Sequence, residues 1–329
     1  GKINIVHPEI DVWEEEDIVS SGLQAIYSTT EKLSAKGLNS RGIGKLIKGL
    51  IAQLKNKINE TLSEKIMEKL KLPTKEESLI NIHFPRNTKK LERSQKRLKF
   101  EELFFLQLHL LKVKQIRNKR FKGYVFEKVD HYFNNYYKNY LTFKLTNAQK
   151  RVLKEIRLDL KSTCQMNRLL QGDVGSGKTL VALMSMLIAV DNNFQTCMMV
   201  PTEILAHQHY KNISYELKGM NVNVALLTGS TKTKERKQLH KRLERGEINI
   251  LLGTHALLED KVKFNNLGFI VIDEQHRFGV AQRAKLWEKN NTPPHVLVMT
   301  ATPIPRTLSM TLYGDLDVSV IDELPPGRK

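Results

Sequence analysis

The sequence predicts an α/β fold, a parallel sheet flanked by helices, preceded by a mostly helical region. Two observations lead to this fold. From residue 145 onward, short β-branched or apolar runs alternate with helical stretches, and such alternation is typical of a parallel sheet. Between residues 40 and 145 the apolar residues instead recur every three or four positions, which is the period of an amphipathic helix.

The strand signal recurs at intervals through the second half of the chain. The runs fall at 167–171, 196–200, 222–228, 248–253, 269–273, 295–300 and 317–321. Open parallel sheets bind their ligands at the carboxyl ends of the strands. We therefore expect the functional residues in the loops that follow these runs.

The region before the sheet reads as several helices. Its apolar residues over 43–70 fall on one helical face, and the Leu-Pro pair at 72–73 ends that pattern. Thr74 followed by Glu77 is a capping-box signature, which predicts the start of the next helix. A further helix is expected to carry residues 91–113.

The start of the chain has a different pattern. Residues 1–9 alternate polar and apolar side chains as far as a His-Pro pair, which predicts one short strand. Because a lone strand is not stable, this strand either pairs with a later one or is the trailing end of a further β-domain. The second interpretation is favoured.

Composition and charge narrow the class of protein. The 329 residues are 40% hydrophobic and carry a formal net charge of +18, which indicates folded cores and polyanionic partners. The two cysteines, Cys164 and Cys197, are too few and too far apart for a disulfide framework or a metal knuckle. No apolar stretch approaches the roughly 20 residues of a membrane span. We expect a cytoplasmic protein without a membrane partner.

Much of the positive charge lies in the segment 86–122, which only Glu92, Glu101 and Glu102 oppose. The basic side chains near one side of the expected helix are Lys89, Arg93, Lys96 and Arg97. They form either a phosphate-binding surface or a solvated face, and the sequence favours neither.

Tyrosines cluster shortly before the sheet, where either packing or base stacking would explain them. The four residues are Tyr132, Tyr136, Tyr137 and Tyr140. We expect packing.

A phosphate-binding loop follows the first strand of the sheet. It has the pattern G-x-x-x-x-G-K-T and consists of Gly172, Asp173, Val174, Gly175, Ser176, Gly177, Lys178 and Thr179. The glycines let backbone N–H groups approach phosphates. Lys178 is expected to reach the β- and γ-phosphates of ATP, and the Thr179 hydroxyl to bind Mg²⁺.

An acidic pair complements this loop. The buried run at 269–273 ends in Asp273 and Glu274. Asp273 is expected to hold Mg²⁺, and Glu274 to orient and deprotonate the attacking water. Gln149 precedes the sheet and is a candidate for adenine contact, although it also forms a capping box with Thr146.

Further motifs follow the order found in superfamily 2 helicases. Residues 273–276 read DEQH, a DExH box, and residues 300–302 read TAT, the third motif of those helicases. Between the phosphate loop and these motifs lie VPTEILA at 200–206, LTGS at 227–230 and GTHALL at 253–258.

Two longer strings narrow the resemblance. They read DEQHRFGVAQR at 273–283 and TATPIPRTLSMTLYGDLDVSVIDELPPGRK at 300–329. The chain resembles the bacterial RecG family, helicases that act on branched DNA and rescue stalled replication forks. IHFP at 82–85 and LKFEELFF at 98–105 resemble the connector of that family, so the resemblance covers nearly the whole chain.

This resemblance implies three regions. Residues 1–20 would be the trailing end of an OB-like wedge domain, 21–144 a helical connector, and 145–329 a first RecA-like helicase domain. A second RecA-like domain supplies the arginine finger in this family, and we expect it to be missing from these residues. Since such a finger contributes about 10³–10⁵ in turnover, the chain alone is expected to hydrolyse ATP only feebly.

The resemblance also implies roles for individual residues. Those expected to face the backbone of single-stranded DNA are Thr202, Thr228, Gly229, Thr254 and His255. Those expected to couple the nucleotide state to the DNA are His276, Gln282, Arg283, Thr300 and Thr302. His207 and His209 form an H-x-H pattern, and we expect surface residues there rather than metal ligands.

The function implied is ATP-dependent remodelling of branched DNA, such as stalled forks and Holliday junctions, in recombination and repair. Two alternatives stay open. The motor of the transcription-repair coupling factor shares the phosphate loop and TATPIPRT, although Gln275 and the run at 313–317 argue against it. The other alternative is a DNA-binding fragment without catalysis.

Overall fold

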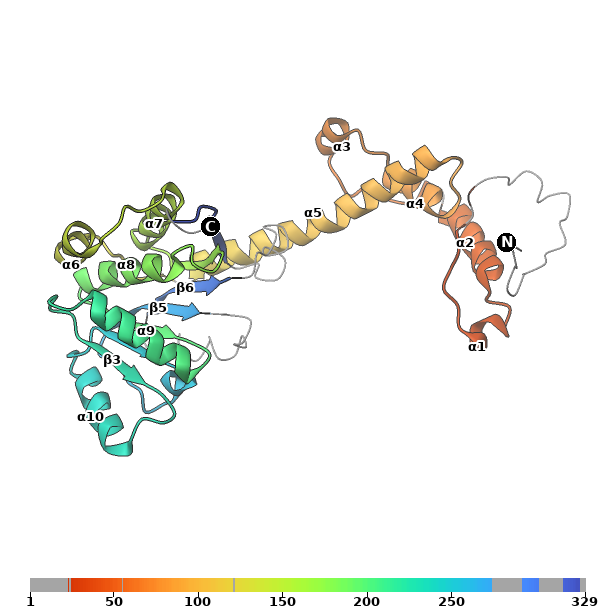
Figure 1. The fold of residues 1–329 in the computed structure, drawn as a ribbon. Helices are drawn as coiled ribbons and strands as arrows, with labels where there is room; N and C mark the ends of the chain where they lie inside the picture. The colour runs from red at the N-terminus through yellow and green to blue at the C-terminus, as the bar shows by residue number, and fades with distance from the viewer. Residues whose placement is uncertain are drawn as a thin grey trace, which may run out of the picture. The chain divides into compact units, whose positions relative to one another are not determined.

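The structure is a computed structural model that describes residues 23, 25–54, 56–120, 122–273, 292–301 and 316–325, with the backbone alone for 117–120. The chain divides into two compact units, Gly1–Leu108 and His109–Lys329 (Figure 1). The strand expected at 1–9 lies outside the described residues. The domain boundaries expected after residues 20 and 144 stay predictions.

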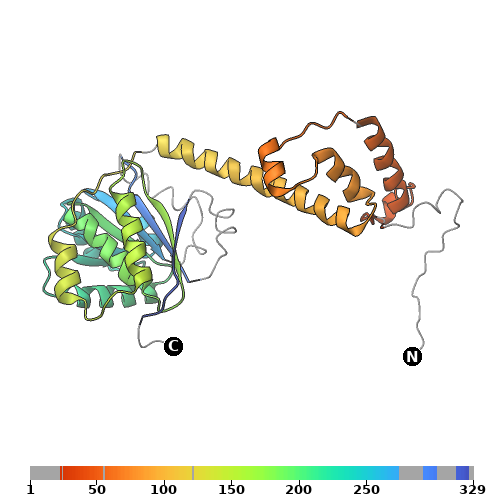
Figure 2. The same cartoon turned by 90° about the horizontal axis from the view of Figure 1, so that it is seen from above.

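The first unit is helical. Its helices are α1 (Glu31–Ser34), α2 (Ser40–Leu54), α3 (Glu64–Leu70), α4 (Lys75–His83) and the first part of α5 (Thr88–Arg120). Figure 2 shows the short helices of this unit gathered beside the N-terminal part of α5. The expected start of α4 is confirmed, because the Thr74 Oγ1 accepts a hydrogen bond from the Glu77 N–H at 3.2 Å.

The single helical face expected over 43–70 is wrong, since α2 ends at Leu54 and α3 begins at Glu64. Asn56 has a φ of 61°, the left-handed conformation in which helices often end. The Glu60 carboxylate then accepts hydrogen bonds from the backbone N–H groups of Thr61 and Leu62. These local bonds compete with the helix.

A buried ion cluster holds this interrupted segment. The Arg97 side chain is 0% exposed and donates to both Glu60 and Glu101. The Lys75 Nζ also donates to Glu101, at 2.9 Å. Both interpretations left open for Arg97, a phosphate-binding surface and a solvated face, are therefore wrong, because its guanidinium is buried against carboxylates inside the unit. Arg93, one turn earlier, is exposed.

The second unit contains the expected parallel sheet. Its strands are β1 (Asn167–Gly172), β2 (Gln195–Met199), β3 (Val224–Leu227), β4 (Ile250–Gly253), β5 (Leu267–Asp273), β6 (His295–Thr300) and β7 (Asp317–Ile321). Their order is β3-β4-β2-β5-β6-β1-β7, and every neighbouring pair is parallel. The α/β fold is confirmed.

Helices cover both faces of this sheet. They are α6 (His131–Asn135), the π-helix η2 (Tyr136–Tyr140), α7 (Asn147–Leu160), α8 (Lys178–Asp191), α9 (Glu203–Glu216), α10 (Thr233–Glu244) and the 3₁₀-helix η3 (His255–Leu258). One core cluster joins α7, α8 and α9 to the sheet, and a second joins α10 and η3 to its other face.

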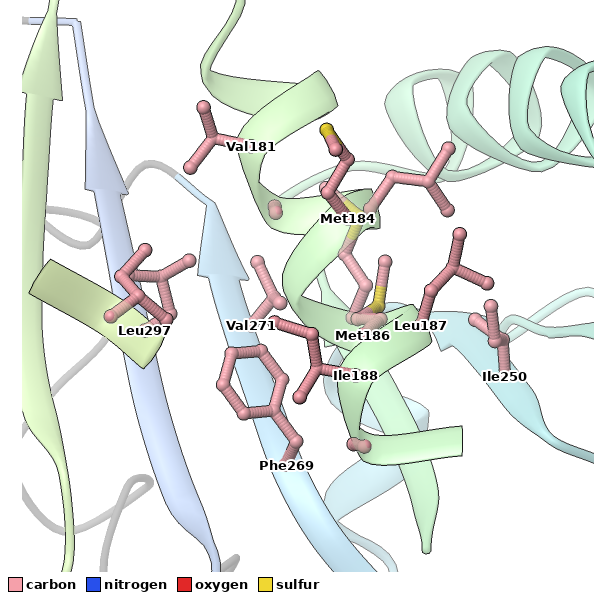
Figure 3. Close-up of a cluster of buried hydrophobic side chains, with 14 of the residues drawn as sticks. Val181, Met184, Met186, Leu187, Ile188, Ile250, Phe269, Val271 and Leu297 are labelled. Atoms are coloured by element: carbon pink, nitrogen blue, oxygen red, sulfur yellow. The ribbon is translucent and has the colours of Figure 1, made fainter. Parts of the chain in front are cut away.

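The central strands are buried on both faces because their side chains alternate between the two clusters. Phe269 and Val271 of β5 pack toward α8 (Figure 3), whereas Ile270 and Ile272 belong to the other cluster. The α8 residues from 181 to 190 are all buried. This helix therefore anchors the loop that precedes it.

Packing is confirmed for three of the four tyrosines. Tyr136 is 2% exposed, its hydroxyl donates to the Glu216 carboxylate, and its burial raises the pKa of the phenol. Tyr132 and Tyr140 pack against the same core, whereas Tyr137 is 43% exposed.

Across the described ranges, no helix combines the length and the apolar character that crossing a bilayer requires.

Candidate nucleotide-binding site

The phosphate loop joins β1 to α8, as expected. Gly175 and Gly177 have φ values of 85° and 88°, which only glycine adopts readily. A Cβ on Gly177 would also overlap the Gln149 amide nitrogen. The loop conformation therefore requires glycine at both positions.

The loop presents donors to an anion. The Lys178 Nζ lies across it and donates to the carbonyl oxygens of Gly172 at 2.7 Å and Asp173 at 2.9 Å. The N-terminus of α8 directs backbone N–H groups and the positive end of the helix dipole at the same place. The buried Ser176 Oγ has no hydrogen-bond partner among the described residues. Such a constellation suits phosphate oxygens.

Gln149 links the start of α7 to this loop. Its Oε1 accepts from the Thr146 N–H at 3.0 Å and completes a capping box, while its Nε2 donates to the Ser176 carbonyl at 2.8 Å. The side chain is 1% exposed. The capping box is confirmed. Adenine contact stays a prediction, and it would have to use an amide group whose oxygen and nitrogen both already have hydrogen-bond partners.

Asp273 lies at the same edge of the sheet as the loop. It ends β5, and its register partner on β6 is Met299. The next residue of β6, Thr300, pairs with Gln171 of β1. One strand thus separates Asp273 from the phosphate loop, and Thr300 ends that intervening strand.

His209 contacts Asp273 directly, with 3.2 Å between His209 Nε2 and Asp273 Oδ2. The two side chains are 13% and 14% exposed. The expectation of a surface residue is therefore wrong for His209 and confirmed for His207, which is exposed. On a helix, position 209 falls on the same face as the buried Ala206 and Ile213.

The donor set fits Mg²⁺. Asp273 offers a carboxylate and Thr179 a hydroxyl, the hard oxygen donors this ion prefers, and it usually takes few protein ligands and completes its shell with phosphates and water. In the described ranges, no group of three or more His, Cys, Asp or Glu side chains could hold a metal.

The expected DNA-facing residues follow the carboxyl ends of β2, β3 and β4, with His255 the first residue of η3, and they differ in exposure. Thr202 caps α9, its Oγ1 accepting from the Leu205 N–H at 3.3 Å. Thr228 and Thr254 are 2% and 1% exposed. Their hydroxyls are thus covered, whereas Gly229 and His255 are exposed; the DNA contacts of all five stay predictions.

A polar network that sequence reasoning missed ties these loops together. The Glu203 carboxylate accepts from the Ser230 N–H at 3.1 Å and from its hydroxyl at 2.7 Å, bonds that lower the pKa of Glu203. Arg236 binds both carboxylate oxygens of Glu259, at 2.8 and 2.9 Å, and donates to the Thr228 carbonyl. Nothing in the local sequence distinguishes Arg236 from the other basic residues of α10.

Five expected site residues lie outside the part of the chain that the structure describes. They are Glu274, His276, Gln282, Arg283 and Thr302. Their catalytic and coupling roles stay predictions.

A phosphate loop after β1 and an aspartate at the end of β5, on one edge of a parallel sheet, define a P-loop nucleotide-binding domain. The family model described as DEAD/DEAH box helicase matches residues 146–311. The chain is 44% identical over 340 residues to ATP-dependent DNA helicase RecG of Aquifex aeolicus, covering 100% of this chain and 42% of that protein.

A second relative is ATP-dependent DNA helicase RecG of Synechocystis, 48% identical over 273 residues, which are 83% of this chain and 33% of that protein. The solved structure of RecG bound to a three-way DNA junction matches with a TM-score of 0.74 and 43% identity, covering 93% of this chain and 40% of that one. The chain belongs to the DEAD/DEAH box helicases and, within them, to the RecG family. It spans less than half the length of these relatives.

Proposed function

We propose that the chain is the nucleotide-binding part of an ATP-driven motor that remodels branched DNA in the cytoplasm. The observation that carries this proposal is the pairing of the phosphate loop with Asp273 at one edge of the sheet. The RecG relatives and the solved three-way-junction complex support the DNA substrate. Forks and Holliday junctions of recombination and repair are the substrates we propose.

Each of the site residues has a separate proposed role in ATP hydrolysis. Lys178 would exchange its two carbonyl partners for phosphate oxygens, with the N-terminus of α8 contributing further positive potential. Thr179 and Asp273 would hold Mg²⁺, which neutralises charge on the β- and γ-phosphates. Glu274 is the proposed base that orients and deprotonates the attacking water.

A pocket in the segment before α7 is the proposed place of the adenine base. It has a volume of about 340 Å³ and is lined by Tyr137, Leu141, Thr142, Phe143 and Lys144. Phe143 is 50% exposed, so its ring offers an apolar face for stacking. This segment directly precedes the helix on which Gln149 lies, so the proposed adenine contact and the stacking surface come from neighbouring stretches of chain.

Replacing Lys178 by alanine is expected to weaken Mg²⁺·ATP binding by about 10- to 150-fold. Hydrogen bonds to charged groups are worth about 1.5–3 kcal/mol, and the side chain has no substitute on the loop. Isothermal titration calorimetry measures the affinity, with Lys161→Ala, an exposed lysine at the end of α7, as the control. Equal affinities for wild type and Lys178→Ala would mean that the site is wrongly assigned.

Sequence-independent DNA binding is expected to depend steeply on salt through the exposed basic residues of α5. Removing one contact between a cationic side chain and a DNA phosphate lowers the log–log slope of affinity against salt by about 0.7–0.9. Arg93→Ala/Lys96→Ala should therefore flatten the slope for forked DNA, as fluorescence anisotropy would show. The control is Lys150→Ala/Lys154→Ala, an exposed lysine pair on α7. Unchanged slopes in the α5 variant would assign those side chains to a solvated face.

A further inference from the structure

We propose that His209 is a positioning residue for the Mg²⁺ site, because it holds the Asp273 carboxylate in the orientation that metal binding needs. This inference rests on the proposed function. It concerns a contact between α9 and β5, two elements that sequence reasoning did not connect. The observation behind it is the 3.2 Å approach of His209 Nε2 to Asp273 Oδ2.

The packing of α9 places this contact. The helix follows β2, and β2 pairs directly with β5, so α9 begins beside the carboxyl end of β5. Ala206 and Ile213 bury one face of α9, at 0% and 1% exposure, and His209 lies between them on that face. The imidazole is thus held against Asp273 by the same packing that holds the helix.

The contact leaves Asp273 capable of binding a metal. A donor on Nε2 occupies Oδ2, and Oδ1 keeps its lone pairs for a metal ion or its water. Partners of this kind fix the rotamer of a ligand, and their loss typically costs 10- to 100-fold in metal affinity. The role requires a donor at this place and does not require a change in the protonation of His209.

The contact also joins two functional regions. The first turn of α9 carries Glu203, whose carboxylate holds Ser230 in the loop expected to face DNA. His209 lies nearly two turns further along the same rigid helix. One helix therefore contacts both the DNA-facing loop and the expected ligand of the metal.

The test measures metal binding rather than turnover. MgCl₂ is titrated into the whole chain with a fluorescent ADP, and the Mg²⁺ concentration at half-maximal change is compared between variants. His209→Phe keeps an aromatic ring without the donor and should raise that concentration about 10- to 100-fold. His209→Gln, which keeps an N–H donor, should restore most of the loss. His207→Phe, on the exposed side of α9, should match wild type.

Affinity for the same ADP in EDTA separates positioning from folding. It should be equal in all four proteins. Two results would overturn the inference. If His209→Phe needs no more Mg²⁺ than wild type, His209 does not position the metal ligand. If His209→Phe loses as much ADP affinity in EDTA as with Mg²⁺, the substitution disturbs the nucleotide site as a whole rather than metal binding. Failure of the wild-type chain to bind the nucleotide would instead overturn the proposed function, and this inference with it.

Discussion

Arg97→Met is expected to destabilise the first unit by about 3–5 kcal/mol, the usual cost of removing one partner from a buried ion cluster. The guanidinium is 0% exposed and bridges Glu60 to Glu101. Its removal leaves two carboxylates close together, with Lys75 bonded to Glu101. Hydrogen exchange measured by mass spectrometry should show faster exchange in α4 and the start of α5, with β1 and β5 unaffected.

The matched control for this prediction is Arg93→Met, one turn earlier on α5. Arg93 is exposed, and its guanidinium donates to the Lys71 carbonyl at 3.2 Å, so a change within about 0.5 kcal/mol is expected. If the two substitutions lowered the free energy of unfolding equally, the buried ion cluster would contribute no more to the stability of the unit than an exposed arginine does.

Acid should also weaken this cluster. Burial alone would raise the pKa of Glu60, but hydrogen bonds from Leu62, Lys75 and Thr61 and from the Arg97 side chain lower it to about 2. Because the folded-state pKa lies below the ordinary value of 4.5, the contribution of Glu60 is complete above pH 4.5. It is lost as the pH falls toward 2.

The second large effect is expected at His295, the first residue of β6. Its ring is 0% exposed, with Nδ1 accepting from the Met166 N–H at 2.9 Å and Nε2 donating to the Tyr124 carbonyl at 2.6 Å. Burial lowers the pKa of this imidazole to about 4, although the bond to Tyr124 opposes that shift. The folded protein therefore holds a neutral histidine that the unfolded chain protonates below pH 6.5.

The sign of the pH dependence follows from this difference. The contribution of His295 to stability is complete above pH 6.5 and falls by about 1.4 kcal/mol for each pH unit down to about 4, or roughly 3 kcal/mol in all. His295→Gln keeps a donor and an acceptor without titrating. The stability advantage of wild type over His295→Gln should shrink across this window in urea unfolding of the second unit.

His207→Gln, at an exposed position on α9, controls for the loss of a histidine elsewhere. A constant difference between wild type and His295→Gln from pH 7 to pH 4 would contradict the prediction.

The geometry of the candidate nucleotide site was largely predictable because it is set by short stretches of chain. A phosphate loop needs Gly175 and Gly177 at φ values near 85°, and that demand is met within one short stretch of chain. Asp273 was predictable for a related reason, since an apolar run that ends in a carboxylate is typical of a buried strand with its acid at the edge. The alternation of such runs with helices then specifies a parallel sheet.

The sequence did not predict contacts between side chains that lie far apart along the chain. Arg97 looked like part of a basic face. One of its partners, Glu101, lies only four residues further along the same helix, but the other, Glu60, lies 37 residues away and on no shared helix. His209 looked like a surface residue because its partner Asp273 lies 64 residues further along. The helical spacing of Ala206 and Ile213 would have placed His209 on the buried face of α9. No local sequence pattern predicts which residue it contacts there.

The sequence by itself thus determined the α/β class, the strands and the position of the phosphate loop, because periodicity and glycine content act within a few residues. Only the tertiary structure decided which charges are buried and paired. The reason is physical: a guanidinium or imidazole is stable both in water and against a carboxylate, and packing of distant segments selects between the two. Arg97 and His209 are the two residues at which that selection changed the interpretation.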